Sequence, residues 1–497
     1  LRVLHIGRHK IEGQYSRITG HLHQWVPHIE PLVQPLSARP YYEPLAARCQ
    51  LLQAMRICHL RPPSSPLSTS DASPFSTTGR LCQRGRLRCR NEAPPMTSPD
   101  CPLKTYKFGH SDLPTAHSPF PASIQPAHNA ALDGIRGGAI LMVIAWHQYA
   151  CTPHPPPTHV FGLVERITSY GWSGVQLFFV LSGFLIANKL LKYNSLIKNI
   201  HKFYIHRAAR ILPLYALCLL AFWVVQTSAA DHGYANPSLL KQGHTPLWHY
   251  LAFIQNYSML ERGVPGAWLT VTWSMAVEVQ FYLIFPFIVA CCPAHRLGKI
   301  LILLVTVPVF FRFIILATNP NGGAWNTLSL PTRIDAFALG ALAAYKLRHG
   351  WVPNHAKCKI IAIAGLAVFL AAPDVLPLLS HYSRLCLLAL CDSAAAVAFV
   401  SIIVLAVRPN HGWVIRLLTF PPLVWLGLVS YALYLFHEPI FYLVHWWIIG
   451  STPALNTASS ATASLFALIL LCIVAEGLHR FIEQPIITAA KTNNTID

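Results

Sequence analysis

The chain contains the stretch Ala131-Leu-Asp-Gly-Ile-Arg-Gly-Gly-Ala-Ile-Leu-Met-Val-Ile-Ala-Trp-His147, from which the fold class can be inferred. This stretch is apolar enough to cross a membrane as a helix, yet it holds Asp133 and Arg136 near one end and His147 at the other. Ionisable side chains within a membrane span are costly and are usually retained for function. Arg136 and His147 are eleven residues apart in the chain, so they share one helix face, roughly 16 Å apart along the axis. The pattern predicts a cation near the membrane edge and an imidazole well inside the membrane.

The composition of the 497 residues indicates a membrane protein, because 53% are hydrophobic and only 11% are charged. A soluble domain carries about a quarter charged residues. Repeated apolar runs of about twenty residues predict an all-α, polytopic bundle of transmembrane helices in the lipid bilayer. We expect about ten spans, near 134–152, 171–191, 209–228, 270–292, 298–317, 330–348, 358–373, 385–407, 422–448 and 461–482.

The basic residues predict how these spans are oriented. The connections at 318–329 and 449–460 contain no Lys or Arg, whereas the connections on the other side are basic. The positive-inside rule places the basic connections in the cytoplasm and, with an even number of spans, both termini there as well. The same rule accounts for the net charge of +19. We therefore expect a multi-pass protein of the cell (inner) membrane and no nucleic-acid partner.

Residues 1–125 differ from the rest of the chain. They are rich in Pro, Ser, Arg and His and show no sustained periodicity. Such a segment buries too little apolar surface to fold alone. We expect either an over-extended reading frame with a true start at Met96 or a disordered basic cytoplasmic tail. The membrane domain is then expected over 126–490.

The familiar signatures of cofactor and metal sites are missing from the sequence. The thirteen cysteines show no CxxC pair or zinc-type spacing, which predicts no disulfide framework and no metal site. No Walker or Rossmann glycine fingerprint occurs. The largest outer connection, 229–269, contains one short apolar piece, Leu247–Tyr257, which is too short to span and is more typical of a re-entrant or interfacial segment. Any chemistry must therefore be carried out by the membrane bundle.

A second candidate site lies in the stretch Trp273-Ser-Met-Ala-Val-Glu-Val-Gln-Phe-Tyr282. Glu278 is about two turns into a span, with a hydroxyl residue four positions away on either side, on the same face. We expect His147 or Arg136 as its partner, because ideal helix rise puts Glu278 and His147 at similar depths. A His–carboxylate pair would suit general-base catalysis. The alternative is an ion pair that only locks helices together.

Arg207 and Arg210 form a third candidate site, at the cytoplasmic entrance of a span. Their i, i+3 spacing puts both on one helix face. They are either ordinary positive-inside anchors or a clamp for a phosphorylated ligand from the cytoplasm, because guanidinium groups match phosphate oxygens.

Two more groups of polar residues lie in the sixth and ninth spans. Arg333-Ile-Asp335 begins the sixth span, and Ser430–Pro439 carries Tyr434 and His437 at i and i+3 in the ninth. A lone histidine in a span is often just a hydrogen-bonded core residue. We favour structural pairing or helix-end roles for Arg312, Asp392, Glu476 and His479.

Taken together, these motifs resemble the acyltransferase-3 family of integral membrane acyltransferases, which includes bacterial O-acetylases of surface and secreted glycans. The resemblance covers residues from about 130 to 487. Leu132–Arg136 with His147 is similar to the family's Arg-x10-His signature. The other motifs follow in order: Phe178–Leu185, Arg207…Arg210…Pro213, Trp273-Ser…Glu278…Gln280-Phe-Tyr282, Arg333-Ile-Asp335, Ser430-Tyr…Tyr434…His437 and Glu483-Gln-Pro485.

The resemblance implies transfer of an acyl group, most simply acetyl, from cytoplasmic acyl-CoA to a hydroxyl of a carbohydrate or glycolipid acceptor on the outer side. Acyl-CoA is then a co-substrate, and no permanently bound cofactor is expected. His147 would act as the base or as a transient acyl carrier, with Arg136 and Glu278 also catalytic, while Arg207 and Arg210 would bind the coenzyme A phosphates. The other motif positions are candidate substrate-binding residues: Asp133, Trp273, Tyr282, Arg333, Asp335 and His437.

Two positions depart from the family pattern. His206 stands where the family often has a further arginine, and Val279 stands where a second glutamate is common after Glu278. Neither departure affects Arg136 or His147.

A proton-coupled transporter or flippase of a lipid-linked or acidic sugar is the main alternative, because intramembrane Arg, His and Glu suit such transport equally well. The two halves of the chain show no obvious inverted repeat of broken helices, which disfavours it. A purely structural or sensory scaffold does not explain ionisable groups at matched depth.

Overall fold

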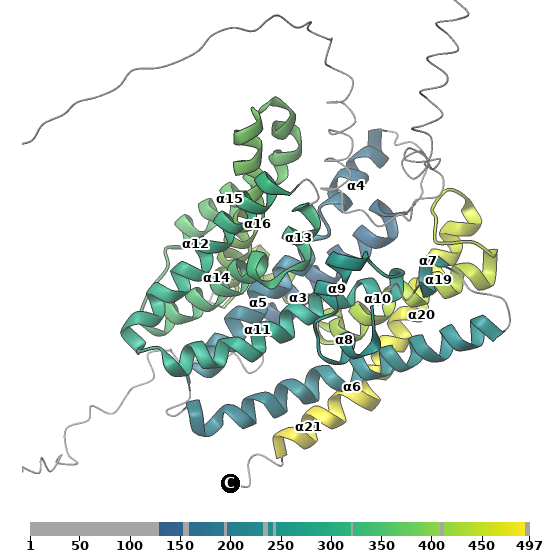
Figure 1. Ribbon diagram of the computed structural model, residues 1–497, viewed down its shortest axis with the longest axis horizontal. Coiled ribbons are helices and arrows are strands. Elements are labelled where there is room, and N and C mark those ends of the chain that lie inside the picture. The colour runs from purple at the N-terminus through teal and green to yellow at the C-terminus, as the bar shows by residue number, and fades with distance from the viewer. Residues whose placement is uncertain are drawn as a thin grey trace, which may run out of the picture. The chain divides into compact units, whose positions relative to one another are not determined.

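The computed structural model describes residues 129–152, 159–192, 196–231, 237–241, 245–319, 322–407 and 412–492. Throughout these ranges the regular structure is helical, which confirms the all-α prediction (Figure 1). The expectations for residues 1–125, including the start at Met96, concern a segment outside the described residues.

Each expected span corresponds to one helix or to two consecutive helices. These are α3 (Ala130–Ala145) with the π-helical turn η4 (Trp146–Ala150), α5 (Ser173–Leu190), α6 (Leu196–Asp231), α11 (Thr272–Cys291), α12 (Ala294–Thr318), α14 (Leu330–Arg348), α15 (His355–Val375), α16 (His381–Ala406), α18 (Pro421–Leu428) with α19 (Ser430–Ile449), and α20 (Ala458–Leu478). The shorter elements are α4 (His159–Ser169), α7 (Pro237–Leu240), α8 (Leu247–Leu251), α9 (Gln255–Arg262), α10 (Ala267–Thr270), α13 (Gly322–Leu328), η5 (Leu376–Leu378), α17 (Trp413–Leu418), η6 (His479–Glu483) and α21 (Gln484–Thr492).

Fewer helices than expected are apolar enough to cross a membrane on their own. Within the described residues seven qualify, or up to eight if α18 and α19, bent by 77°, form one span. The two expected spans that fall short are α3, which has 16 residues before it widens into η4, and α14, whose last turn carries Lys346 and Arg348 and whose first half buries Arg333 and Asp335. Most residues of both helices are buried in the protein. A helix shielded from lipid by its neighbours need not be apolar all round, so the chain is a multi-pass membrane protein with polar helices at its centre.

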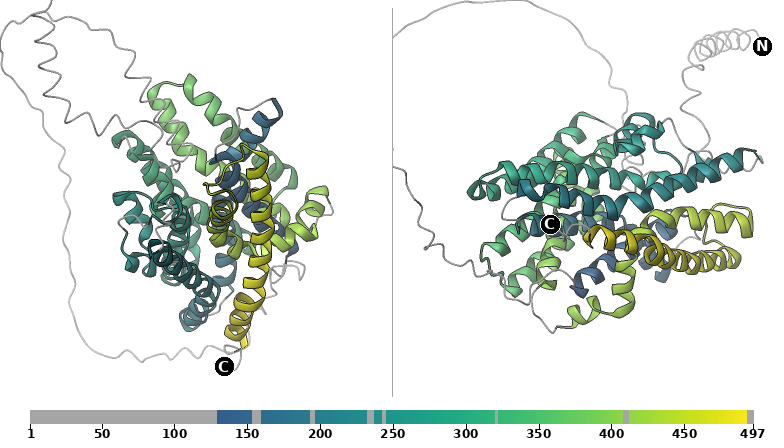
Figure 2. Two further views of the ribbon diagram at one scale, coloured as in Figure 1. Left: turned by 90° about the vertical axis from the view of Figure 1, so that its right-hand side faces the viewer. Right: turned by 90° about the horizontal axis from the view of Figure 1, so that it is seen from below.

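Helix α5 lies at the centre of the described bundle. It packs against α3, α11, α14 and α16. Helix α15 packs against α16, and the short turn η5 joins the two. Helix α6 packs against α21 near the C-terminal end of the described chain (Figure 2). This arrangement places Arg136 of α3, Arg207 of α6 and Glu278 of α11 around a cavity that α5 also lines.

Helices α3 and α18 pack with their backbones in contact. A Cβ atom at Gly137 would collide with the carbonyl oxygen of Leu423, and one at Gly427 would collide with the carbonyl oxygen of Asp133. Small residues allow such close approach between membrane helices, where lipid offers no hydrophobic driving force for association. The packing fixes the first turns of α3, which carry Arg136.

Replacing Gly137 by alanine is expected to force α3 away from α18 and to destabilise the protein by roughly 1–3 kcal/mol, the usual cost of overpacking. The measurement is the midpoint of thermal denaturation in detergent. Gly138→Ala is the matched control, because a Cβ atom at this neighbouring position meets nothing within 4 Å. Equal midpoints for the two variants would contradict the close contact.

The short apolar piece Leu247–Tyr257 forms α8 and the start of α9 and is anchored to the bundle by amide side chains. Gln255 is fully buried and donates to the hydroxyl of Tyr215. Asn256 donates to the carbonyl of Leu328 at 2.9 Å. Burial also raises the pKa of the Tyr250 phenol above its usual value, which keeps it neutral. The segment is therefore docked on the bundle and, as predicted from its length, does not span.

Two buried ion pairs join α12, α14 and α16. Arg312 and Asp335 are 2.8 Å apart, and both side chains are fully buried. Arg333 and Asp392 are 3.1 Å apart. Ser393 completes the network by accepting a hydrogen bond from Arg312 and donating one to Asp335. Arg312 and Asp392 are thus paired within the protein, which is one of the two roles expected for them.

Candidate active site

A cavity lies between α3, α5, α6, α11 and α19. Its empty space, including the part open to solvent, is about 780 Å³. The lining consists of Arg136, Val175, Phe178, Phe179, Leu181, Ser182, Leu185, Arg207, Arg210, Ile211, Ser274, Met275, Glu278, Tyr282, Ser430, Tyr431 and Tyr434. Ten of these residues are apolar or aromatic and seven are arginine, glutamate or serine, so the cavity is more polar than most small-molecule sites.

Three of the lining residues are arginines. Arg136 forms an ion pair with Asp133, one turn earlier on α3. The guanidinium of Arg207 lies over the ring of Tyr282, 5.5 Å from its centroid, and its buried Nε atom has no hydrogen-bond partner among the described residues. With Arg210, these side chains give one cavity three cations. Such a cluster favours an anionic ligand, and phosphate in particular.

Glu278 is the carboxylate in the cavity wall, and its partners differ from the predicted ones. It accepts a hydrogen bond from the hydroxyl of Ser182 at 2.6 Å and another from the hydroxyl of Tyr282. Tyr282 is one turn further along the same helix face, and Ser182 faces it from α5. Among the described residues, Glu278 bonds Ser182 and Tyr282 and not His147 or Arg136, so the predicted pairing is wrong. Arg136 and Glu278 nevertheless line the same cavity.

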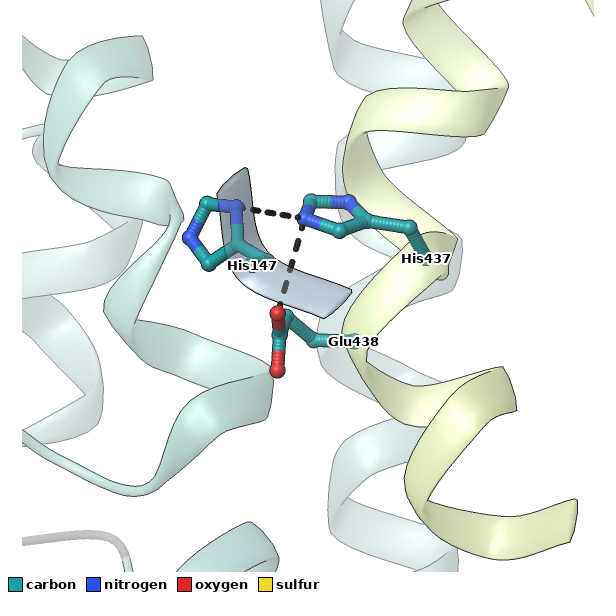
Figure 3. A group of neighbouring side chains, drawn as sticks. All are labelled: His147, His437 and Glu438. Atoms are coloured by element: carbon teal, nitrogen blue, oxygen red, sulfur yellow. Dashed lines mark hydrogen bonds and ion pairs between the residues drawn. The ribbon is translucent and has the colours of Figure 1, made fainter. Parts of the chain in front are cut away.

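His147 lies in a second polar cluster, with His437 and Glu438 of α19 (Figure 3). Its Nδ1 atom is 3.3 Å from Nε2 of His437, which is in turn 3.7 Å from a carboxylate oxygen of Glu438. His437 and Glu438 are buried, whereas His147 is half-buried. The ring of His147 projects from η4, the π-helical turn that follows α3. Such turns inside α-helices occur frequently at functional sites.

Tyr434 connects the two polar groups. Its side chain lines the cavity and contacts the hydroxyl of Ser274 at 2.6 Å. Its backbone carbonyl accepts a hydrogen bond from Nδ1 of His437 at 2.8 Å. The histidine cluster therefore begins one helical turn beyond the cavity wall.

The residues of this cluster also offer one possible metal ligand each. The ligand atoms of His147, His437 and Glu438 lie within 4.8 Å of one another. The Nδ1 atom of His147, however, is also 2.9 Å from the carbonyl oxygen of Val143. A carbonyl only accepts hydrogen bonds, so this nitrogen carries a proton and is not available as a ligand. The cluster fits a hydrogen-bond network better than a metal site.

Comparison with known proteins agrees with the motifs. A family model described as an acyltransferase domain matches residues 129–477, which include the cavity and the histidine cluster. The chain belongs to the acyltransferase-3 family. The resemblance predicted from the motifs is therefore confirmed.

Several curated relatives of the acyltransferase-3 family are similar to the chain. The peptidoglycan O-acetyltransferase OatA of Listeria monocytogenes is 27% identical over 389 residues, which cover 72% of this chain and 55% of the relative. The putative peptidoglycan O-acetyltransferase YrhL of Bacillus subtilis is 27% identical, with 72% and 54% covered. The O-acetyltransferase OatA of Staphylococcus aureus is 25% identical, with 73% and 57% covered. The chain thus spans about half the length of these relatives, and no solved structure gives a significant match.

The acyltransferase-3 motif residues fall into separate groups in the structure. The cavity brings together Arg136, Arg207, Arg210, Glu278 and Tyr282. Arg136, predicted to share a helix face with His147, lines this cavity with the two arginines of α6, whereas His147 does not line it. The two members of the family signature thus lie in different parts of the site.

The other predicted binding residues lie outside the cavity lining. Asp133 pairs with Arg136. Trp273 packs edge-on against Phe179. Arg333 and Asp335 take part in the buried ion pairs of α14, and the guanidinium of Arg333 also lies over the ring of Trp172. His437 lies beside His147.

Two groups that the sequence analysis did not single out complete the site. Ser182 holds Glu278, and Glu438 lies against the histidine pair. A signal existed for Glu438, because two adjacent ionisable residues at the centre of an apolar span are unusual. Ser182 lies within the predicted motif Phe178–Leu185 but was given no role of its own, since a single serine in a helix is common.

Proposed function

We propose that this protein transfers an acyl group, most simply acetyl, from cytoplasmic acyl-CoA to a hydroxyl of a surface or secreted carbohydrate or glycoconjugate. The observation that carries the proposal is the three-arginine cavity, whose wall residue Tyr434 is bonded to the histidine cluster. Family membership supports the acyl-transfer chemistry. The catalytic unit is the membrane domain over 126–490, with both termini in the cytoplasm.

The charges of the cavity support coenzyme A as the donor. Three arginines and one glutamate line it, so cations are in excess there. Coenzyme A carries phosphate groups at its nucleotide end and a long, weakly polar pantetheine arm. The arginines would hold the phosphates, and the arm would extend along the apolar wall toward Tyr434 and His147.

The chemistry of transfer needs a base near the thioester. In the proposal, His147 takes the proton of the acceptor hydroxyl, the oxygen attacks the thioester carbonyl, and the C–S bond breaks. The thiolate of coenzyme A then takes the proton from His147. Arg136 lines the cavity and, in the proposal, contacts the acyl-CoA donor bound there. A two-step route through acyl-His147 is the alternative, and ping-pong kinetics would reveal it.

The names of the relatives suggest peptidoglycan as the first acceptor to test. Cell-envelope glycans and secreted glycoconjugates from cells with and without the gene should differ by the mass of one acyl unit on the modified sugar. Identical mass spectra for all these glycans would contradict the proposal.

Replacing Arg210 by glutamine is expected to raise the KM for acetyl-CoA about tenfold with little change in kcat, because a charge-assisted bond to phosphate is lost. The assay uses inside-out vesicles of the producing cell, which contain the native acceptor, and varies the acetyl-CoA concentration. Arg166→Gln is the control, since Arg166 is exposed and pairs with Asp374 outside the cavity. An unchanged KM for both variants would remove Arg210 from the donor site.

A further inference from the structure

The hydrogen-bond partners of His437 determine where its proton lies. Its Nδ1 atom is 2.8 Å from the backbone carbonyl of Tyr434. Because a carbonyl only accepts, Nδ1 carries the hydrogen, and the Nε2 atom of the neutral ring holds a lone pair. His437 is fully buried, so this lone pair points at its protein neighbours.

The same reasoning applies to His147. Its Nδ1 atom faces two acceptors, the carbonyl of Val143 at 2.9 Å and Nε2 of His437 at 3.3 Å. The hydrogen therefore lies on Nδ1, and Nε2 of His147 has the free lone pair. Figure 3 shows this second nitrogen pointing away from His437 and Glu438. His147 is half-buried, so of the two imidazoles it is the more accessible one.

We infer that His437 is a positioning residue that, together with the carbonyl of Val143, holds His147 in the one tautomer able to act as a base through Nε2. This inference rests on the proposed function. The acceptor hydroxyl gives its proton to Nε2 of His147, while the Nδ1 hydrogen stays directed at Val143 and His437. A histidine of the opposite tautomer would present an N–H to the hydroxyl and could not take its proton.

Glu438 has a related role in the second half of the cycle. Once His147 is protonated, a positive charge stands inside a membrane protein, where unpaired charges are costly. The carboxylate of Glu438 lies within 4.8 Å of the His147 nitrogen and 3.7 Å from His437. It is therefore placed to balance the imidazolium until the proton passes to the coenzyme A thiolate.

Two substitutions of His437 test the inference in inside-out vesicles. His437→Leu removes the acceptor, and kcat is expected to fall about 100-fold, within the range of general-base catalysis, while the KM for acetyl-CoA changes less than about twofold. His437→Gln places an amide oxygen close to the former Nε2 position, and we expect it to recover at least about tenfold of the lost kcat. A residue with a merely structural role would not show this rescue.

His445→Leu is the matched control, because His445 is also fully buried on α19 but bonds Ser464, outside both clusters. Its kcat is expected to stay near that of the wild type. If His437→Leu does not fold, Glu438→Gln carries the test, with about tenfold lower kcat expected at unchanged KM. A wild-type kcat in the tested variant, with His147→Ala inactive, would overturn the inference and leave the proposed function standing. An active His147→Ala would instead contradict the proposed function.

Discussion

Replacing His147 by alanine is expected to lower acyl transfer at least about 1,000-fold in inside-out vesicles, because general-base catalysis alone contributes up to about 10⁴-fold. The physical reason is that the reaction loses the base that accepts the hydroxyl proton. Nearby His437 is fully buried and turned toward the protein, so it does not substitute. The measurement is the rate at which labelled acetyl passes from acetyl-CoA to the membrane-bound acceptor.

The loss of activity must be separated from a loss of fold. We expect His147→Ala to insert into the membrane and to denature at nearly the wild-type temperature, since the removed side chain is half-buried. His249→Ala is the control, because His249 is also half-buried and bonds Ser258 outside both clusters. Equal activity of the two variants would show that His147 is not the base.

The second large effect concerns the buried ion pair of Arg312 and Asp335, whose side chains are both fully buried. Arg312→Leu is expected to destabilise the protein by about 3–5 kcal/mol, because it leaves a carboxylate uncompensated inside the bundle. The double variant Arg312→Leu/Asp335→Leu should recover much of this loss, since neither charge remains. Thermal denaturation in detergent measures both effects.

An exposed pair provides the contrast. Arg166 and Asp374 also form an ion pair, but their side chains are 58% and 61% exposed. Arg166→Leu is therefore expected to cost less than about 1 kcal/mol. A double variant at the buried pair that is less stable than Arg312→Leu would mean that the carboxylate of Asp335 stabilises the fold through other bonds, such as the one it accepts from Ser393.

Much of the fold could be predicted because lipid restricts the chain to helices whose apolar runs are visible in the sequence. The two expected spans that are not apolar enough to cross a membrane on their own, α3 and α14, both carry charged residues. Helix α14 is only weakly apolar because it contains Arg333 and Asp335. Both are buried within the protein and are not exposed to lipid. Which face of such a helix packs against its neighbours depends on the whole bundle. The hydrophobic periodicity of the helix's own sequence does not determine it.

Several residues of the candidate site could be predicted from the sequence, but not how they pair. Spacing and residue type identified Arg136, His147 and Glu278, because ionisable groups stand out in apolar spans. Their partners come from other helices: Ser182 on α5 for Glu278, and His437 on α19 for His147. Matched depth along the membrane normal made Glu278 and His147 plausible partners, but their separation within the membrane plane is set by the packing of the helices.

The proposed function requires the membrane bundle to carry an acyl group from a thioester to a glycan hydroxyl. Inside-out vesicles that contain the native acceptor should therefore be supplied with acetyl-CoA labelled in the acetyl group, and the label on glycan should be measured. The proposed function predicts label on the glycan and release of one free thiol per acetyl transferred with the wild-type protein, and neither with His147→Ala. Unlabelled glycan with the wild-type protein, or equal label with His147→Ala, would contradict it.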